Sequence, residues 1–225
     1  MEPSEDRARI ALSLATAALV VLGVAYIVRT SFTQGGRRVF CLWDDAMISM
    51  TYARNLAEGH GLVWNPDGER VQGFSNLGVT LVMAALHRLP LDPEHTALAF
   101  QLLCLACLVA TSIGVARVAG RDDPWQGFAA ASFTLFAAPL AIWSLQGSDA
   151  APLALWLVAG AGVLAQPSPR PACVAALAAG ALLRPDAGLF FGVALAARAT
   201  CAPRPRAALR AGALALASSA GAYLL

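Results

Sequence analysis

Long apolar segments alternate with short polar intervals along the chain, and one largely polar interval, 30–95, is much longer than the others. A bilayer-crossing helix needs about 20 apolar residues, so the pattern predicts an all-α membrane protein with roughly six or seven spans. The first apolar segment is longer than that of a signal peptide, and we interpret it as a retained helix. The predicted spans are 10–28, 96–116, 127–145, 151–165, 172–183, 187–197 and a last one from residue 208 onward.

Segment 76–89 is short for a span and ends in His87 and Arg88. This composition is typical of an amphipathic helix that lies flat in the membrane interface, and a crossing helix is the alternative.

Two short apolar segments, 172–183 and 187–197, flank Arg184 within "RPDAG". The pair is either one long helix with a charge near its middle or two short helices that meet at this point. Pro185 and Gly188 favour a break, and a charge deep in lipid is costly unless it lines a polar cavity.

A mean hydropathy of +0.61 with 13% charged residues is typical of an integral membrane protein without a separate soluble domain. All 16 basic residues are Arg, and the net charge of +2 is too small and scattered to predict a nucleic-acid partner. Cys104 and Cys107 have C-x-x-C spacing inside an apolar run without further ligands, so we interpret them as packing residues. Because the final apolar segment ends without a polar cap, we expect 1–225 to be the N-terminal part of a longer protein.

The positions of the Arg residues predict an orientation, because basic residues gather on the inner side of a membrane. If 76–89 lies flat and the chain turns at Arg184, the outer side holds interval 30–95, the turn at Asp149 and the turn at Arg184. This arrangement puts the unusual polar residues on one face. The inner side then holds Arg7, Arg9, Arg117, Arg121, Arg170, Arg198, Arg204, Arg206 and Arg210.

The polar interval contains "FCLWDDAMISMTYARNLAEGHGLVWNPDGERVQGFSN" at 40–76. The sequence after the two carboxylates predicts a short helix with Asp44 and Asp45 at its head, where carboxylates also favour the positive end of a helix. Arg54 is suited to a structural ion pair as well as to a substrate. His60 lies between two glycines and is suited to a turn as well as to a ligand.

The stretch 44–76 resembles the first extracytoplasmic loop of the GT-C glycosyltransferases, most closely the branch that contains the mycobacterial terminal arabinofuranosyltransferase. In that branch a DDA segment leads into YARNLA-G-G-L-V-x-N and then into an E-G-Y-T-N element. The present sequence has Gln72, Phe74 and Ser75 in place of the Glu, Tyr and Thr of that element.

Two later segments resemble the same family more loosely. "LQGSDAAPLAL" is similar to its G-M-E-T-P-L-F turn, with Asp149 in place of Glu and one extra residue before Pro152. "LLRPDAGLFF" is similar to its T-R-P-E-G segment, with Leu183 in place of Thr.

The resemblance implies a GT-C type polytopic helical module whose long first extracytoplasmic loop, 30–95, contains short interfacial helices. It implies a multi-pass enzyme of the bacterial inner (plasma) membrane with its active site facing the periplasm or exterior. The implied partners are a polyprenyl-phosphate-linked sugar donor, a glycan or lipid acceptor of the cell envelope, and the lipid bilayer.

An acceptor hydroxyl is a poor nucleophile, so a carboxylate must take its proton, and Asp44 or Asp45 could do so. The resemblance implies Asp44. Two adjacent carboxylates also repel one another's charge or together bind a divalent cation or a donor hydroxyl, which leaves the cofactor unknown. The phosphate leaving group needs a cation, for which Arg184 is suited unless it only pairs with Asp149 or Asp186. The predicted substrate-binding residues are Arg54, His60, Asn76, Asp149, Arg184 and Asp186.

Trp43 and Trp64 are suited to anchoring in the membrane interface as well as to stacking on a sugar. The alternative to an enzyme is a non-catalytic polytopic membrane protein, either transporter-like or a scaffold, or an inactive fragment. A transporter needs charged residues near the bilayer midplane along a path open to both sides, whereas this chain gathers them at one surface.

Overall fold

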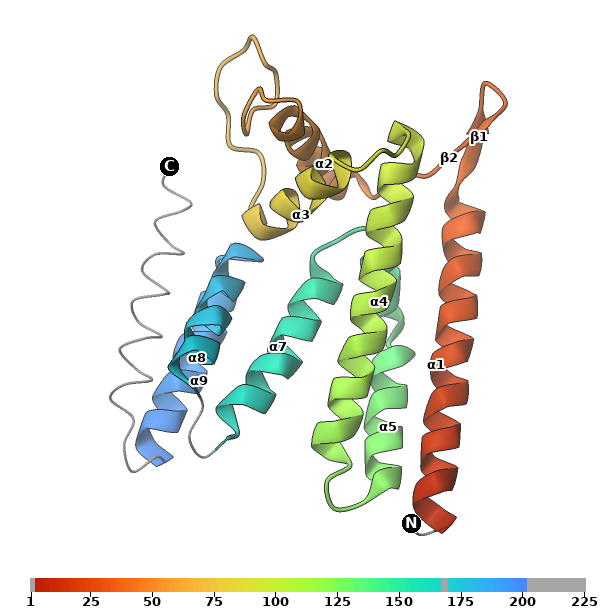
Figure 1. The fold of residues 1–225 in the computed structure, drawn as a ribbon, viewed down its shortest axis with the longest axis vertical. Helices are drawn as coiled ribbons and strands as arrows, with labels where there is room; N and C mark the ends of the chain where they lie inside the picture. The colour runs from red at the N-terminus through yellow and green to blue at the C-terminus, as the bar shows by residue number, and fades with distance from the viewer. Residues whose placement is uncertain (1–2, 167–169, 202–225) are drawn as a thin grey trace.

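The computed structural model describes residues 3–166 and 170–201 and is mostly helical (Figure 1). Long and short apolar helices form a bundle, and two short helices, α2 (Asp44–Ala57) and α3 (Leu77–His87), lie at one end of it. The bundle consists of α1 (Pro3–Thr30), α4 (Pro93–Ala119), α5 (Pro124–Leu135), α6 (Ala138–Leu145), α7 (Ala150–Leu164), α8 (Pro171–Ala178), the 3-10 turn η1 (Ala179–Leu182) and α9 (Ala187–Cys201).

Within residues 3–166 and 170–201, two helices are long and apolar enough to cross a membrane, α1 and α4, and the count rises to three if α5 and α6 form one broken span. This number is below the predicted six or seven. Helix α7 has 15 residues and α8 has eight, so both fall short of the roughly 20 residues that a crossing needs. The span predicted from residue 208 onward lies outside the described residues.

The predicted span over 127–145 is not one continuous helix, because α5 and α6 meet at an angle of 52°, as in a broken span or a re-entrant loop. Pro139 lies at the start of α6 and has no N–H to donate to the carbonyl of Leu135. The chain therefore ends one helix at Leu135 and begins the next at Ala138.

The predicted break at Arg184 is confirmed. Helix α8 tightens into η1, the chain turns at 183–186, and α9 begins at Ala187. Pro185 follows Arg184 directly, and the residue before a proline is driven away from helical geometry. Arg184 therefore lies in a turn and not inside a long apolar helix.

Helix α3 has 11 residues, which is about 16 Å of helix, and therefore falls short of a bilayer's apolar thickness. It buries Val79 and Met83 against α2 and the bundle, while Leu81 and Val82 remain exposed. An apolar face opposite the packed face suits the predicted flat placement in an interface.

One element departs from the predicted all-α fold. Strands β1 (Phe32–Gln34) and β2 (Arg37–Val39) form an antiparallel hairpin beyond the end of α1, with Phe32 opposite Val39 (Figure 1). Gly35 and Gly36 connect them with φ angles of +58° and +79°. Two consecutive residues with positive φ make the tight hairpin turn that glycine favours.

The predicted inner-side and outer-side residues lie at opposite ends of the bundle. The turns at Asp149 and Arg184 lie at the end occupied by α2 and α3 (Figure 1). The last turn of α4, which carries Arg117, and the connection from α4 to α5 lie at the other end. Arg204, Arg206 and Arg210 lie outside the described residues, and the assignment of either end to the outside stays a prediction.

Candidate functional site

A cavity of about 600 Å³ lies between α2 and the segment before α3 on one side and the ends of α6, α7 and η1 on the other. We refer to it as the site cavity. Four of the eight predicted site residues line it, together with two tryptophans and three serines. These residues are Trp43, Asp45, Ser49, Ser75, Asn76, Trp143, Ser148, Asp149 and Arg184.

The turn between α6 and α7 is fixed against the segment that precedes α2. The backbone N–H of Trp43 donates to the carbonyl of Gln146 at 2.8 Å. Buried Gln101 of α4 donates from Nε2 to the carbonyl of Leu145 at 2.9 Å. These bonds bring the turn that carries Asp149 to the N-terminal end of α2, although the two lie far apart in the sequence.

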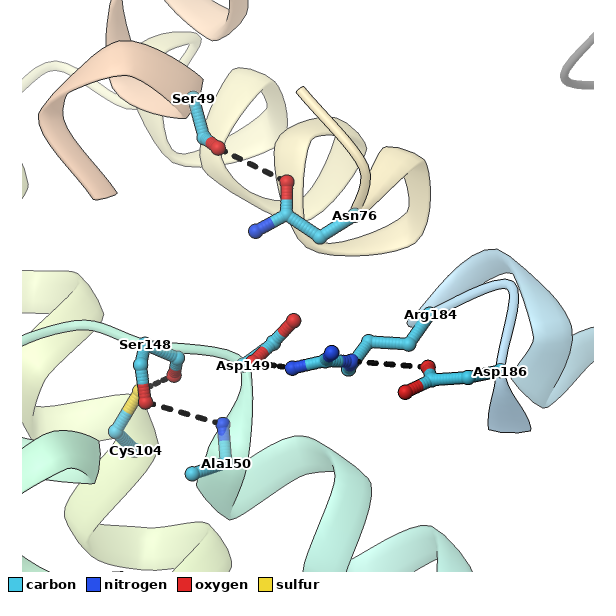
Figure 2. A network of polar contacts seen from close by, with 8 residues as sticks. All are labelled: Ser49, Asn76, Cys104, Ser148, Asp149, Ala150, Arg184 and Asp186. Atoms are coloured by element: carbon cyan, nitrogen blue, oxygen red, sulfur yellow. Dashed lines mark hydrogen bonds and ion pairs between the residues drawn. The ribbon is translucent and has the colours of Figure 1, made fainter. Parts of the chain in front are cut away.

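Arg184 lies between two carboxylates (Figure 2). Its Nε donates to Oδ1 of Asp186 at 3.0 Å, and its Nη1 lies 3.7 Å from Oδ1 of Asp149. Both pairs that the sequence suggested as structural partners are therefore present. The side chain of Arg184 is 44% exposed and lines the site cavity, so these contacts orient the guanidinium without enclosing it.

The two carboxylates that hold Arg184 differ in their surroundings. The side chain of Asp149 is 15% exposed, whereas that of Asp186 is 57% exposed. Burial raises the pKa of the Asp149 carboxyl above its usual range; Arg184 and a backbone hydrogen bond oppose this shift, and the charge of Asp186 adds to it. The hydrogen bond to Asp186 raises the pKa of Arg184, so the guanidinium keeps its charge.

Asn76 joins the site cavity to α2. Ser49 Oγ donates to Asn76 Oδ1 at 2.9 Å (Figure 2). Thr80 Oγ1 lies 3.3 Å from the same oxygen. Ser49 was not predicted as a site residue. Its signal was its spacing, because it follows Asp45 by four residues and so shares a helix face with it.

The adjacent carboxylates at the head of α2 have different positions. Asp45 lines the site cavity, and Asp44 is not among the residues that do. Asp44 Oδ1 accepts a hydrogen bond from the backbone N–H of Asp45 at 2.9 Å. Asp44 therefore contacts the start of its own helix, and the geometry favours Asp45 as the carboxylate that meets a ligand.

The tryptophans Trp43 and Trp143 form one wall of the site cavity. Their ring centroids lie 5.3 Å apart at an interplanar angle of 70°, an edge-to-face arrangement that aromatic pairs prefer. Each ring is nearly half exposed, so the pair presents an apolar surface beside the charged residues.

Arg54 and His60 do not reach the site cavity. Arg54 lies in the last turn of α2 and lines a second hollow of about 430 Å³ with Glu58, His87 and Arg88, which we refer to as the basic hollow. His60 Nε2 lies 3.9 Å from Oε2 of Glu58 in the loop that follows. Their predicted role in substrate binding has no support from this placement.

The pKa of His87 is lowered, first by burial and then by the positive charge of Arg54, while Glu58 acts in the opposite direction. Its Nε2 lies 3.0 Å from the sulfur of Met50.

Among residues 3–166 and 170–201 no group of three or more His, Cys, Asp or Glu is arranged to hold a metal ion. Comparison with protein-family models, with curated proteins and with solved structures gives no match to this chain. The function proposed for this chain therefore depends on its own residues and on the geometry of the site cavity.

Proposed function

We propose that this chain is a membrane glycosyltransferase of the GT-C class. In this proposal it moves a sugar from a polyprenyl-phosphate donor to a hydroxyl of a glycan or lipid acceptor at the outer face of a bacterial inner membrane. One observation carries the proposal. The three segments that resemble the family, at 44–76, 145–155 and 182–191, are far apart in the sequence, and each contributes one charged residue to the same cavity: Asp45, Asp149 and Arg184.

Asp45 is the general base of the proposed reaction. A carboxylate within hydrogen-bond reach of the acceptor hydroxyl takes its proton as the oxygen attacks the anomeric carbon of the donor sugar. Asp45 lies at the cavity, whereas the carboxylate of Asp44 is bonded to the start of α2. The proposal therefore departs from the family resemblance, which implies Asp44.

Arg184 receives the phosphate of the donor. When the glycosidic bond breaks, negative charge stays on the phosphate, and a guanidinium stabilises it with two parallel hydrogen bonds. Arg184 has five N–H donors, of which Nε is engaged by Asp186. Asp149 and Asp186 orient the guanidinium, and its partial exposure leaves the outer nitrogens accessible from the cavity.

The apolar part of the cavity suits the rest of the donor. Pro139, Leu140 and Trp143 of α6 line it beside the charged residues, at one end of an apolar helical bundle. A polyprenyl chain in the bilayer can thus approach along α6 while its phosphate meets Arg184 at the membrane surface.

The test is sugar transfer by the purified full-length protein in lipid nanodiscs, with radiolabelled polyprenyl-phosphate sugars and a cell-envelope glycan extract. Asp45→Asn keeps the shape of the side chain but cannot take a proton, so we expect transfer to fall by about a hundredfold or more. Asp122→Asn, in the connection between α4 and α5 at the opposite end of the bundle, is the matched control and should leave the rate unchanged.

Two results would change the assignment. If Asp44→Asn loses transfer and Asp45→Asn does not, the base is Asp44, as the resemblance implies. If neither substitution affects transfer, or no donor sugar is transferred, the enzyme proposal fails and a transporter-like or scaffold role takes its place.

A further inference from the structure

A third hollow of about 460 Å³ lies beside the site cavity, between α2 and the loop that precedes α3. We refer to it as the outer cleft. Ile48 and Gly73 line both the outer cleft and the site cavity, so the two are neighbours along one side of α2. The side chains that give the outer cleft its chemistry are Tyr52, Trp64, Asn65 and Glu69.

Buried side chains of α2 hold the loop that forms the outer cleft. Asn55 is 3% exposed and donates from Nδ2 to the carbonyls of Val63 and Trp64 at 2.7 and 2.9 Å. Tyr52 is 1% exposed and donates its hydroxyl to the carbonyl of Val71 at 2.6 Å. Because both ends of the loop are bonded to α2, the residues between them are presented in a defined arrangement.

Trp64 is exposed even though its backbone is anchored. Its ring centroid lies 5.9 Å from that of Tyr52, and the side chain remains 42% exposed. Asn65 and Glu69 are exposed next to it and offer an amide and a carboxylate. An aromatic face flanked by a few polar groups suits a ligand with an apolar ring face and hydroxyls at its edge.

We propose that the outer cleft is the subsite that binds a sugar ring of the acceptor. The ring stacks on Trp64, and its hydroxyls bond to Asn65 and Glu69. The inference rests on the proposed function in one respect. The acceptor would continue from the outer cleft past Ile48 and Gly73, so that its reacting hydroxyl reaches Asp45 in the site cavity.

An exposed tryptophan also suits a membrane anchor, and the chain contains a matched control for that role. Trp125 is 43% exposed, against 42% for Trp64, and lies in the first turn of α5 at the opposite end of the bundle. It packs edge-to-face on Phe128 and lines neither the site cavity nor the outer cleft.

The test uses full-length protein in lipid nanodiscs without any donor. Binding is measured to immobilised methyl-capped disaccharides of mannose, galactose and arabinose, in pyranose and furanose forms. We expect at least one disaccharide to bind, Trp64→Ala to weaken that binding about tenfold, and Trp125→Ala to leave it within about twofold. Trp64→Phe keeps an aromatic face and should retain most of the binding, which separates lost stacking from a misfolded loop.

The proposal is overturned if none of the disaccharides binds to the wild type, or if Trp64→Ala binds like the wild type. It is also overturned if Trp64→Ala lowers association with phosphatidylglycerol vesicles while glycan binding is unchanged, because Trp64 is then an anchor.

Binding without donor keeps this inference separate from the proposed function. Glycan binding that depends on Trp64, in a protein that transfers no sugar, supports the subsite and overturns the enzyme proposal. Sugar transfer whose KM for the acceptor is the same in Trp64→Ala and wild type supports the enzyme and overturns the subsite.

Discussion

The site cavity and the basic hollow lie at opposite ends of α2, and their charges are opposite in balance. At the N-terminal end, the site cavity is lined by two carboxylates, those of Asp45 and Asp149, and by one cation, Arg184. At the C-terminal end, Arg54 and Arg88 accompany a single carboxylate, that of Glu58. The two hollows therefore present arginines in contrasting settings at the two ends of one helix.

The contrast teaches how to separate a structural arginine from a candidate ligand-binding one. Arg54 lies in the last turn of α2, where a positive charge is favoured by the helix dipole without a specific partner. Arg184 lies in a turn outside any helix and is oriented by Asp149 and Asp186. A guanidinium that carboxylates hold at the edge of a cavity is prepared to meet an anion, and one at a helix end need not be.

The largest expected effect comes from a glycine in each region. Gly147 has a φ of +89°, and a Cβ there would lie 2.8 Å from Leu42. Gly59 has a φ of +92° with nothing within 4 Å. We expect Gly147→Ala to lower the free energy of unfolding by about 2 to 4 kcal/mol, from backbone strain and overpacking, and Gly59→Ala by about 1 to 2 kcal/mol, from strain alone.

Chemical denaturation in detergent micelles measures both changes. Because Gly147 precedes Asp149 by two residues, Gly147→Ala should also abolish sugar transfer. Equal losses of stability in the two variants would contradict the inference that Leu42 packs closely against Gly147 in the turn between α6 and α7.

A lysine in place of each arginine sharpens the comparison. Arg184→Lys keeps the charge but loses the planar fork, so we expect the affinity for a polyprenyl-phosphate sugar to fall about tenfold. Arg54→Lys should leave that affinity unchanged. Isothermal titration with the donor in nanodiscs checks both, and an unaltered affinity in Arg184→Lys would contradict the proposed role of Arg184 in binding the donor phosphate.

The two regions should respond to pH with opposite slopes. The pKa of Asp149 is raised in the folded protein, so the folded state binds more protons than the unfolded state from about pH 3.8 upward. The free energy of unfolding falls as pH rises through that window. The pKa of His87 is lowered, so below 6.5 the unfolded state binds more protons and the free energy of unfolding rises with pH.

Denaturation curves from about pH 4 to about pH 8 separate the two contributions. Asp149→Asn should remove the fall in stability, and His87→Gln should remove the rise. A wild-type slope that neither substitution alters would show that other groups determine the pH dependence.

The smallest effect is expected at His60. Its contact with Glu58 is 3.9 Å long and about half exposed, and such surface pairs contribute about 0.2 to 1 kcal/mol at most. We expect His60→Ala to change the free energy of unfolding, measured by chemical denaturation, by less than about 1 kcal/mol. Sugar transfer should stay within about twofold of wild type. A large loss of transfer would restore His60 as the substrate-binding residue that its sequence context suggests.

The sequence by itself determined the features that depend on neighbouring residues. The run of apolar residues specified α1 and α4 as membrane-length helices, and the proline after Arg184 specified a break in the chain. Asp44 and Asp45 begin α2 as predicted. The bend at Pro139 and the hairpin at Gly35 and Gly36 also have local signals, a proline and two consecutive glycines, which the prediction of spans from apolar segments did not use.

Only the tertiary structure decided which polar side chains meet. Successive residues of a helix point about 100° apart, so Asp44 and Asp45 diverge, and the docking of α2 determines which of them enters the cavity. That docking depends on long-range contacts, such as buried Met83 of α3 and Gln101 of α4, which no local pattern encodes. For the same reason Ser49 lines the site cavity, whereas Arg54 and His60, from the same stretch of sequence, lie away from it.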